Sequence, residues 1–350
     1  MLTRLLLTTT FLALGATTSF AADDVTVTKT PDALEFKIGK ETAARYQHAG
    51  TVQVEKGETT KPLAKPFFWP LYAPGNVPVT RAWPMKRDNP NDTTDHYHQK
   101  SVWFCHGDVI PEGLEIKTKS SNKHVKGANF WDETPGYSSI VCVEVGEPKT
   151  LSAGHVVVPT RNEWRTPDGV KILDEVRNIH FVSTPTGRLI AFDIDLHAST
   201  YPITFGDTKE GSLGVRVNDV MRTVAKDGGT VTSSSGATAK TPAKDNLPVW
   251  GEIAEWHDYS GTVDGKPVGL TVFTDPKNPP AAWHTRAYGL MAANPFGRAG
   301  SGFPSQKGKT ELLKIAKGDH LKLRFGVFAH TGDAATGKVA ETYKAFTEMK

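Results

Sequence analysis

The fold is decided by the stretch Arg188-Leu189-Ile190-Ala191-Phe192-Asp193-Ile194-Asp195-Leu196-His197-Ala198. The even-numbered positions from 190 to 196 are Ile, Phe, Ile and Leu, whereas the odd-numbered positions from 193 to 197 are Asp, Asp and His. Successive side chains of a strand point to opposite faces, so this pattern predicts a β-strand with one apolar and one polar face. We expect the apolar face to belong to a sheet core. The polar face must border either water or a wet cleft.

Strand patterns of this kind recur along the chain, at residues 25–27, 34–38, 66–72, 140–145, 155–158, 175–182, 268–273 and 321–328. Only the C-terminus indicates a helix, because Val339, Tyr343 and Phe346 follow one another at i, i+4 and i+7. Residues 226–244 are rich in Gly, Ser, Thr and Ala, which indicates an inserted loop or a weak hairpin. Many short strands and little helix predict an all-β sandwich with a short C-terminal helix.

The chain begins with the pattern of a secretory signal peptide. Arg4 supplies a positive start, a short apolar core follows, and Ser19-Phe20-Ala21 fits the small-x-small cleavage rule. We expect removal of residues 1–21, which leaves residues 22–350 as a single β-sandwich domain. The apolar core is too short to span a bilayer, and no later segment approaches the required length. The mature protein is therefore expected to be soluble and either periplasmic or secreted, with no membrane contact after cleavage.

The charge balance argues against a nucleic-acid partner. The formal net charge is +3, and basic and acidic residues are interspersed, so no basic footprint is present. The two cysteines, Cys105 and Cys142, belong to a compartment that permits disulfides. Their spacing does not determine whether they pair.

The densest polar chemistry lies in Asp95-His96-Tyr97-His98-Gln99-Lys100-Ser101-Val102-Trp103-Phe104-Cys105-His106-Gly107-Asp108. His96 and His98 are two residues apart, so they share a face on an extended backbone, and His106 has the same parity. Histidine titrates nearest neutral pH and is the commonest metal ligand, so the stretch is a candidate site. The alternative is a set of surface or hydrogen-bonded sheet histidines. A metal would also need a third ligand, either His106 or the distant His284.

A second stretch, Thr204–Val217, places Lys209 and Glu210 in a loop flanked by glycines, just before a strand that carries Arg216. A carboxylate and cations close together can hold a hydroxylated or anionic ligand, or the cations can lower the pKa of Glu210. The alternative is a charged turn.

A third stretch, Trp283–Leu290, carries His284 and Arg286 at positions that share a face if the chain is extended, and Tyr288 can join them. Trp283 and Tyr288 suit the faces of sugar rings, with core packing as the alternative. The chain contains no Gly-x-Ser-x-Gly, phosphate loop, dinucleotide fingerprint or His-Glu-x-x-His motif. We therefore expect no cofactor, and a divalent metal on His96 and His98 is the alternative.

These stretches together resemble a family of exported bacterial proteins of unassigned function that often carry the label methane-oxygenase-like. The matching residues extend across nearly the whole mature chain. They are Pro70-Leu71-Tyr72, Arg81-x-x-Pro84-Met85, Asp95-His96-x-His98, Trp103-Phe104-x-His106-Gly107-Asp108, Phe205-Gly206-Asp207-Thr208-Lys209-Glu210-Gly211, Asp258-Tyr259-Ser260-Gly261, Trp283-His284-x-Arg286-x-Tyr288-Gly289-Leu290 and Asn294-Pro295-Phe296-Gly297.

The family is similar to the galactose-mutarotase-like β-supersandwich, which sugar epimerases, polysaccharide lyases and glycoside hydrolases share. Their clefts use His, Arg, Tyr and carboxylate side chains from a concave sheet. The resemblance implies that the concave face gathers His96, His98, His106, Asp108, His284 and Arg286.

The function expected from this resemblance is action on a carbohydrate by hydrolysis, elimination or epimerisation, each of which needs a positioned acid and base. We assign His96 or His98 as the general base and His284 as the partner acid. Glu210 orients or replaces one of the histidines, and Arg286 and Lys209 bind substrate oxygens. The alternatives are a non-catalytic carbohydrate-binding or accessory protein and a metal-dependent oxidoreductase.

Overall fold

The computed structural model describes residues 24–57, 59–90, 92–240 and 247–349. The predicted signal peptide, with its cleavage site after Ala21, lies outside these residues. Within the described ranges, no helix has the length and apolar character that crossing a bilayer requires.

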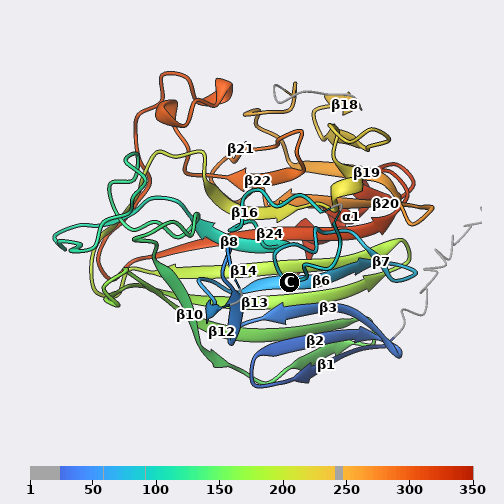
Figure 1. Ribbon diagram of the computed structural model, residues 1–350, viewed down its shortest axis with the longest axis horizontal. Helices are drawn as coiled ribbons and strands as arrows, with labels where there is room; N and C mark the ends of the chain where they lie inside the picture. The colour runs from blue at the N-terminus through green and yellow to red at the C-terminus, as the bar shows by residue number, and fades with distance from the viewer. Residues whose placement is uncertain (1–23, 58, 91, 241–246, 350) are drawn as a thin grey trace, which may run out of the picture.

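Two large antiparallel sheets make up most of the described chain (Figure 1). The first has nine described strands. In spatial order they are β1 (Val25–Lys29), β2 (Ala33–Ile38), β3 (Glu41–Gln47), β6 (Phe67–Ala73), β8 (Val102–His106), β16 (Gly211–Arg216), β22 (Leu290–Asn294) and β21 (Ala282–Trp283), with β7 (Val77–Pro78) beside β6.

The second sheet has ten described strands. In spatial order they are β10 (Ser139–Val145), β12 (His155–Arg165), β13 (Lys171–Thr184), β14 (Gly187–His197), β24 (His320–Thr331), β20 (Lys266–Thr274), β19 (Trp256–Val263), β17 (Thr230–Ser233) and β18 (Thr238–Lys240), with β11 (Lys149–Ser152) beside β12.

Smaller elements complete the described fold. They are a three-stranded sheet of β23 (Lys314–Ile315), β15 (Ile203–Phe205) and β9 (Val109–Pro111), a pair of β4 (Thr51–Gln53) and β5 (Thr60–Pro62), three short 3₁₀ turns at Asp219–Met221, Ala299–Ser301 and Pro304–Gln306, and the helix α1 (Val339–Glu348).

Strand β14 contains the alternating stretch and lies in the middle of the ten-stranded sheet, between β13 and β24. Its apolar side chains at positions 190, 192, 194 and 196 are at most 2 % exposed and belong to the main core. Asp193, Asp195 and His197 are half-exposed on the other face. The prediction of a strand with one core face and one wet face is confirmed.

The main core lies between the two sheets, as aromatic contacts show. Phe104 of β8 contacts Trp164 of β12 and Phe325 of β24, with ring centroids 5.9 Å apart in both pairs. The preceding residue, Trp103, points to the opposite face, where its ring lies 5.1 Å from that of Trp131. The loop that carries Trp131 therefore covers part of the outer face of the nine-stranded sheet.

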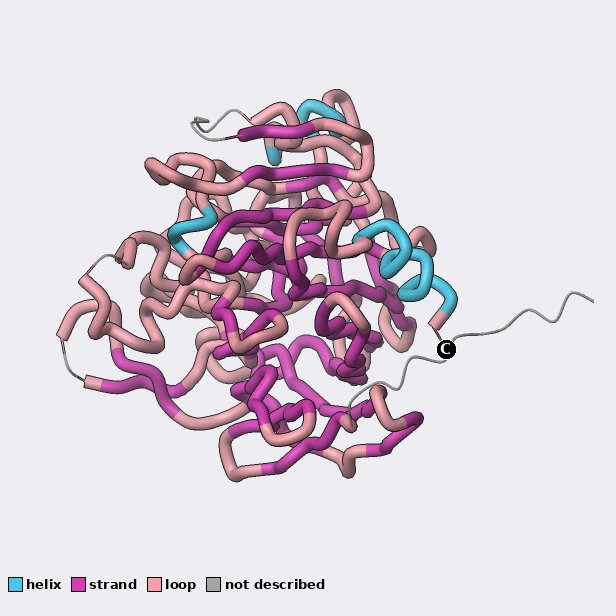
Figure 2. Tube along the Cα trace, turned by 90° about the vertical axis from the view of Figure 1, so that its right-hand side faces the viewer, coloured by secondary structure: helices cyan, strands magenta, loops and turns pink. Residues whose placement is uncertain are grey.

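Helix α1 packs on the outer face of the ten-stranded sheet and lies at one side of the strands in Figure 2. Its Val339 and Phe346 contact Leu189, Phe273 and Phe328, all of which are buried. Full burial of one such phenylalanine contributes about 1.5–3 kcal/mol. The predicted C-terminal helix is therefore present, and its apolar stripe explains its position.

The prediction of an all-β sandwich with a short C-terminal helix is confirmed in its architecture. The described part of the predicted insertion forms the β17–β18 hairpin at one edge of the ten-stranded sheet. Cys105 and Cys142 form no disulfide with each other.

Candidate functional site

The candidate site lies on the outer face of the nine-stranded sheet, where three loops meet. The loops precede β8, precede β16 and connect β21 to β22, and β8, β16 and β22 are neighbours in the sheet. His96 of the first loop stacks on Tyr288 of the third, with ring centroids 4.7 Å apart and an interplanar angle of 11°. Glu210 of the second loop lies 3.9 Å (Oε2) from Nδ1 of His284 in the third. Segments almost two hundred residues apart thus share one site.

His96 and His98 lie in a loop whose backbone is not extended, so the shared strand face that an extended chain would give them does not form. Strand β8 begins only at Val102, and His96 has φ of +48°, in the left-handed region. The backbone closes a turn here, because the Gln99 amide donates to the His96 carbonyl at 2.9 Å. The two histidine rings still approach each other, with centroids 5.8 Å apart and an interplanar angle of 80°.

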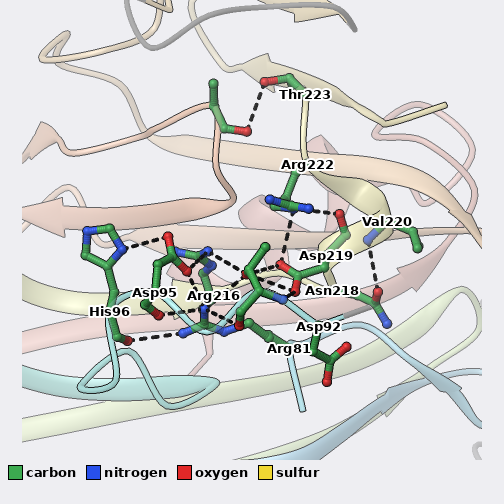
Figure 3. A network of polar contacts seen from close by, with 12 residues as sticks. Arg81, Asp92, Asp95, His96, Arg216, Asn218, Asp219, Val220, Arg222 and Thr223 are labelled. Carbon is green, nitrogen blue, oxygen red and sulfur yellow. Dashed lines mark hydrogen bonds and ion pairs between the residues drawn. The ribbon is translucent and has the colours of Figure 1, made fainter. Parts of the chain in front are cut away.

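Asp95 orients the imidazole of His96 (Figure 3). Nδ1 of His96 donates to Asp95 Oδ2 at 2.8 Å. Because an ionised carboxylate can only accept, Nδ1 carries the proton and Nε2 is left as a basic lone pair. Arg81 and Arg216 each donate to Asp95 Oδ1 at 2.7 Å. Although burial favours the neutral acid, the hydrogen bond from His96 and the charges of Arg216 and Arg81 hold the pKa of Asp95 well below its usual range.

Arg81 also organises the loop that carries His96. Its guanidinium is 0 % exposed and donates to the backbone carbonyls of Asp95 at 2.8 Å, His96 at 3.1 Å and Gln99 at 3.3 Å. Arg216 is equally buried and donates to the Gln99 side-chain oxygen at 2.8 Å. The sequence analysis assigned no roles to Asp95, Arg81 and Arg216. Asp95 directly precedes His96, and Arg216 lies in the same stretch as Glu210, so their positions in the sequence could have indicated a role in the site.

Glu210 is the acidic group of the site. Its side chain is 26 % exposed, and burial raises the pKa of Glu210 to about 7, whereas the positive charges of Lys209 and Arg286 act in the opposite direction. Asp132 adds to the upward shift. A carboxyl group with this pKa carries a proton in a large fraction of molecules at neutral pH, so it can donate one.

His284 is a neutral acceptor in this site. Its side chain is 2 % exposed, and Nδ1 donates to the Lys209 carbonyl at 3.1 Å, which leaves Nε2 as a lone pair with no hydrogen-bond partner among the described residues. Burial, together with the charges of Lys209 and Arg286, lowers the pKa of His284 to about 3. The expected role of His284 as the acid therefore does not suit this geometry, and Glu210 fits that role.

Tyr288 and Arg286 are half-buried beside these groups. The Tyr288 ring is stacked by His96, and the guanidinium carbon of Arg216 lies 4.6 Å from its centroid. Both groups therefore contact the ring on which the stacking of a sugar was expected. Burial raises the pKa of Tyr288 to about 12, so its hydroxyl remains a donor. Tyr259 fixes the neighbouring backbone by donating to the Arg286 carbonyl at 2.6 Å.

His98 is half-buried and has a cluster of buried charges beside it. Its ring lies 6.5 Å from that of Trp131. Glu133 pairs with Lys65 at 3.4 Å and with Lys100, and all three side chains are at most 3 % exposed. Burial and the charge of Lys65 lower the pKa of His98 well below its usual value. His98 is therefore a neutral imidazole at neutral pH.

His106 and Trp283 lie in the core, away from the site. His106 is 0 % exposed, its Nε2 donates to the Gly206 carbonyl at 2.9 Å, and its ring lies 4.9 Å from that of Phe296. Trp283 is also 0 % exposed, donates to the Ala254 carbonyl at 2.9 Å and stacks on His257. Their positions in buried strands β8 and β21 explain why neither reaches a ligand. The expectation that they bind substrate is not supported by these positions.

Asp108 is likewise committed to the scaffold. It is 2 % exposed, and its Oδ1 accepts hydrogen bonds from the Lys126 amide at 3.0 Å and the Gly127 amide at 2.7 Å, so it anchors a loop. The predicted residues that the structure does bring together are His96, His98, Lys209, Glu210, His284, Arg286 and Tyr288.

The described residues contain no group of three or more His, Cys, Asp or Glu side chains placed to hold a metal ion.

Solved structures similar to this chain include carbohydrate-active proteins at low identity. A galactose 1-epimerase from Lactobacillus acidophilus is 7 % identical over 88 % of this chain and 98 % of its own, with a TM-score of 0.40. A galactose mutarotase-like protein from Lactobacillus casei is 11 % identical over 87 % and 100 %, with a TM-score of 0.33. A GH36 alpha-galactosidase from Geobacillus stearothermophilus is 8 % identical over 89 % of this chain, with a TM-score of 0.44, and this chain spans 42 % of its length.

No curated protein matches the sequence. A family model matches residues 33–344, which include all three loops of the site, both large sheets except β1, and the first part of α1. The chain therefore belongs to the family of unknown function DUF6807.

Proposed function

We propose that this protein is an exported enzyme that acts on a carbohydrate by acid/base chemistry. The observation that carries the proposal is a base and an acid in one site: His96, with Nδ1 held by Asp95 and Nε2 basic, and Glu210, with a pKa of about 7. Hydrolysis, elimination and epimerisation of sugars all need such a pair near neutral pH. The signal-like segment at residues 1–21 supports export.

Each side chain has a distinct role in this proposal. Nε2 of His96 accepts the proton, and the Glu210 carboxyl donates one. Arg286 and Lys209 bind substrate oxygens, since both place positive charge beside Glu210. The Tyr288 hydroxyl donates a hydrogen bond, and Nε2 of His284 accepts one. A ligand with many hydroxyl groups matches this mixture of donors and acceptors.

The direct test is a screen of the purified mature protein against neutral and acidic glycans, with products identified by mass spectrometry. We expect product from one glycan class. Saturable binding without product would instead favour the non-catalytic carbohydrate-binding protein. Turnover that chelators abolish, with bound metal lost from His96→Ala and His98→Ala, would favour the metal-dependent enzyme.

On the substrate identified in this way, His96→Ala should lower turnover by roughly 10²- to 10⁴-fold, the usual contribution of positioned proton transfer. The melting temperature should change little, because the His96 side chain is 39 % exposed. His124→Ala is the matched control, since His124 is exposed outside the site. A variant that keeps wild-type turnover would remove His96 from the mechanism.

The pH dependence follows from the acid role of Glu210. Its pKa is raised to about 7, so the proton is present below that pH and is lost as the pH rises through it. We therefore expect kcat/KM, which reports the free enzyme, to fall above about pH 7 in a profile measured between about pH 5 and pH 9. A profile that instead rises through pH 7 would contradict the acid role and make Glu210 a base.

A further inference from the structure

The outer face of the ten-stranded sheet carries two adjoining hollows that the acid/base site does not use. One has a volume of about 380 Å³ and the other about 320 Å³. Val176 and Asp195 line both, so the hollows lie next to each other. Each falls within the roughly 300–1,000 Å³ that is typical of small-molecule sites.

This face is remote from the candidate site. The candidate site lies outside the nine-stranded sheet, and the hollows lie outside the ten-stranded sheet, so the core between the sheets separates them. On strand β14, Leu189 lies under α1, whereas Asp193 and Asp195, of the same parity, extend beyond the helix into the first hollow. The helix therefore closes one end of this face and leaves the polar end open.

The first hollow has no excess of either charge. Its described lining contains three carboxylates and three cationic side chains. They are Asp193, Asp195 and Asp275, and Lys277, Lys322 and Arg324. An ion would meet as much repulsion as attraction here, whereas a neutral ligand with many hydroxyl groups finds both donors and acceptors.

Contacts within the protein hold these polar groups in place. Asp193 pairs with Arg324 at 3.0 Å, and its other oxygen lies 3.2 Å from Nε2 of His180. Nδ1 of His320 lies 2.7 Å from Asp195 Oδ1. Arg324 also donates to the Met349 carbonyl at 2.6 Å. A ligand would therefore bind groups that are already positioned, which reduces the ordering cost of binding.

The hollows also offer flat or apolar contacts. Val176 is 42 % exposed at the point where the two hollows meet. In the second hollow, the rings of His197 and His320 stack with centroids 4.2 Å apart and an interplanar angle of 4°. A sugar ring has C–H faces and hydroxyl edges, so it matches apolar contacts bordered by fixed polar groups.

We propose that this outer face is a second binding site, which holds a neutral oligosaccharide across Val176 with sugar units in both hollows. The site works independently of the acid/base site and would keep a glycan attached to the protein on the face opposite the chemistry.

Isothermal titration calorimetry with maltotriose, cellotriose and galactotriose, and with trigalacturonate as the charged counterpart, tests the proposal. We expect at least one neutral trisaccharide to bind wild-type protein. Asp195→Ala removes an acceptor shared by both hollows, and Val176→Glu places a charge at their junction. Each should weaken binding roughly tenfold or more, because a hydrogen bond to a charged group is lost or the ligand path is blocked.

Glu163→Gln is the matched control, because Glu163 is a carboxylate of the same sheet, on strand β12 next to β13, and lines neither hollow. It should bind as the wild type does. Val176 and Asp195 are partly exposed, so melting temperatures should show that both variants fold. The proposal is overturned if no neutral trisaccharide binds, if both variants bind like wild type, or if trigalacturonate is preferred. Binding lost in His96→Ala but kept in Asp195→Ala would place the sugar in the acid/base site and would also overturn it.

Discussion

Glu210→Gln should lower turnover by roughly 10²- to 10⁴-fold, because glutamine keeps the size of the side chain but has no acidic proton to donate. The fold should survive the change. The hydrogen bonds that hold this residue in place involve its backbone and not its carboxyl group. Its amide donates to Thr208 Oγ1 at 3.1 Å, and its carbonyl accepts from the Gly107 amide at 2.7 Å. Steady-state kinetics on the substrate from the glycan screen, together with a melting curve, measures both effects.

Two further results discriminate among explanations for a loss of activity in Glu210→Gln. The fall of kcat/KM above about pH 7 should disappear in the variant, because the group that titrates there is gone. Glu163→Gln, the same chemical change outside the site, should retain wild-type turnover. If Glu210→Gln melts much earlier but works normally per folded molecule, the residue is structural and the acid must be sought elsewhere.

Glu175→Ala should lower the free energy of unfolding by about 3–5 kcal/mol, the cost expected when one partner of a buried ion pair is removed. Glu175 and Arg177 pair at 2.5 Å, and their side chains are at most 1 % exposed. Glu175 also accepts a hydrogen bond from Trp164 at 2.7 Å, and Arg177 donates to the Tyr46 hydroxyl at 2.9 Å. Removal of the carboxylate leaves a buried guanidinium without its counter-charge.

Urea denaturation monitored by tryptophan fluorescence measures this loss. Glu163→Ala removes a partly exposed partner of Arg165 and should cost only about 0–1 kcal/mol. Glu175→Gln, which keeps an oxygen for Trp164, should be less damaging than Glu175→Ala and gives a measurable variant if the alanine protein does not fold. Equal losses for Glu175→Ala and Glu163→Ala would show that the buried pair stabilises the fold no more than the partly exposed pair of Glu163 and Arg165 does.

The periodicity of the sequence determined the local structure. Alternation in the stretch at 188–198 specified β14 and its core face, because strand geometry alone sends successive side chains to opposite sides. The spacing of Val339 and Phe346 likewise specified α1 and the stripe that it buries. The three polar stretches also named most members of the site, since His96, Glu210 and His284 come one from each.

Only the tertiary structure decided which of these polar residues face a ligand and which serve the core. His106 has the parity predicted for a site residue, yet β8 and β16 place it among Phe205 and Phe296. Asp95 orients His96 because Arg216, 121 residues away in the chain, reaches the same carboxylate. Burial likewise raises the pKa of Glu210. Spacing along the chain controls only local geometry, whereas desolvation and charge pairing depend on which distant segments pack together, and that is set by the order of strands in the sheets.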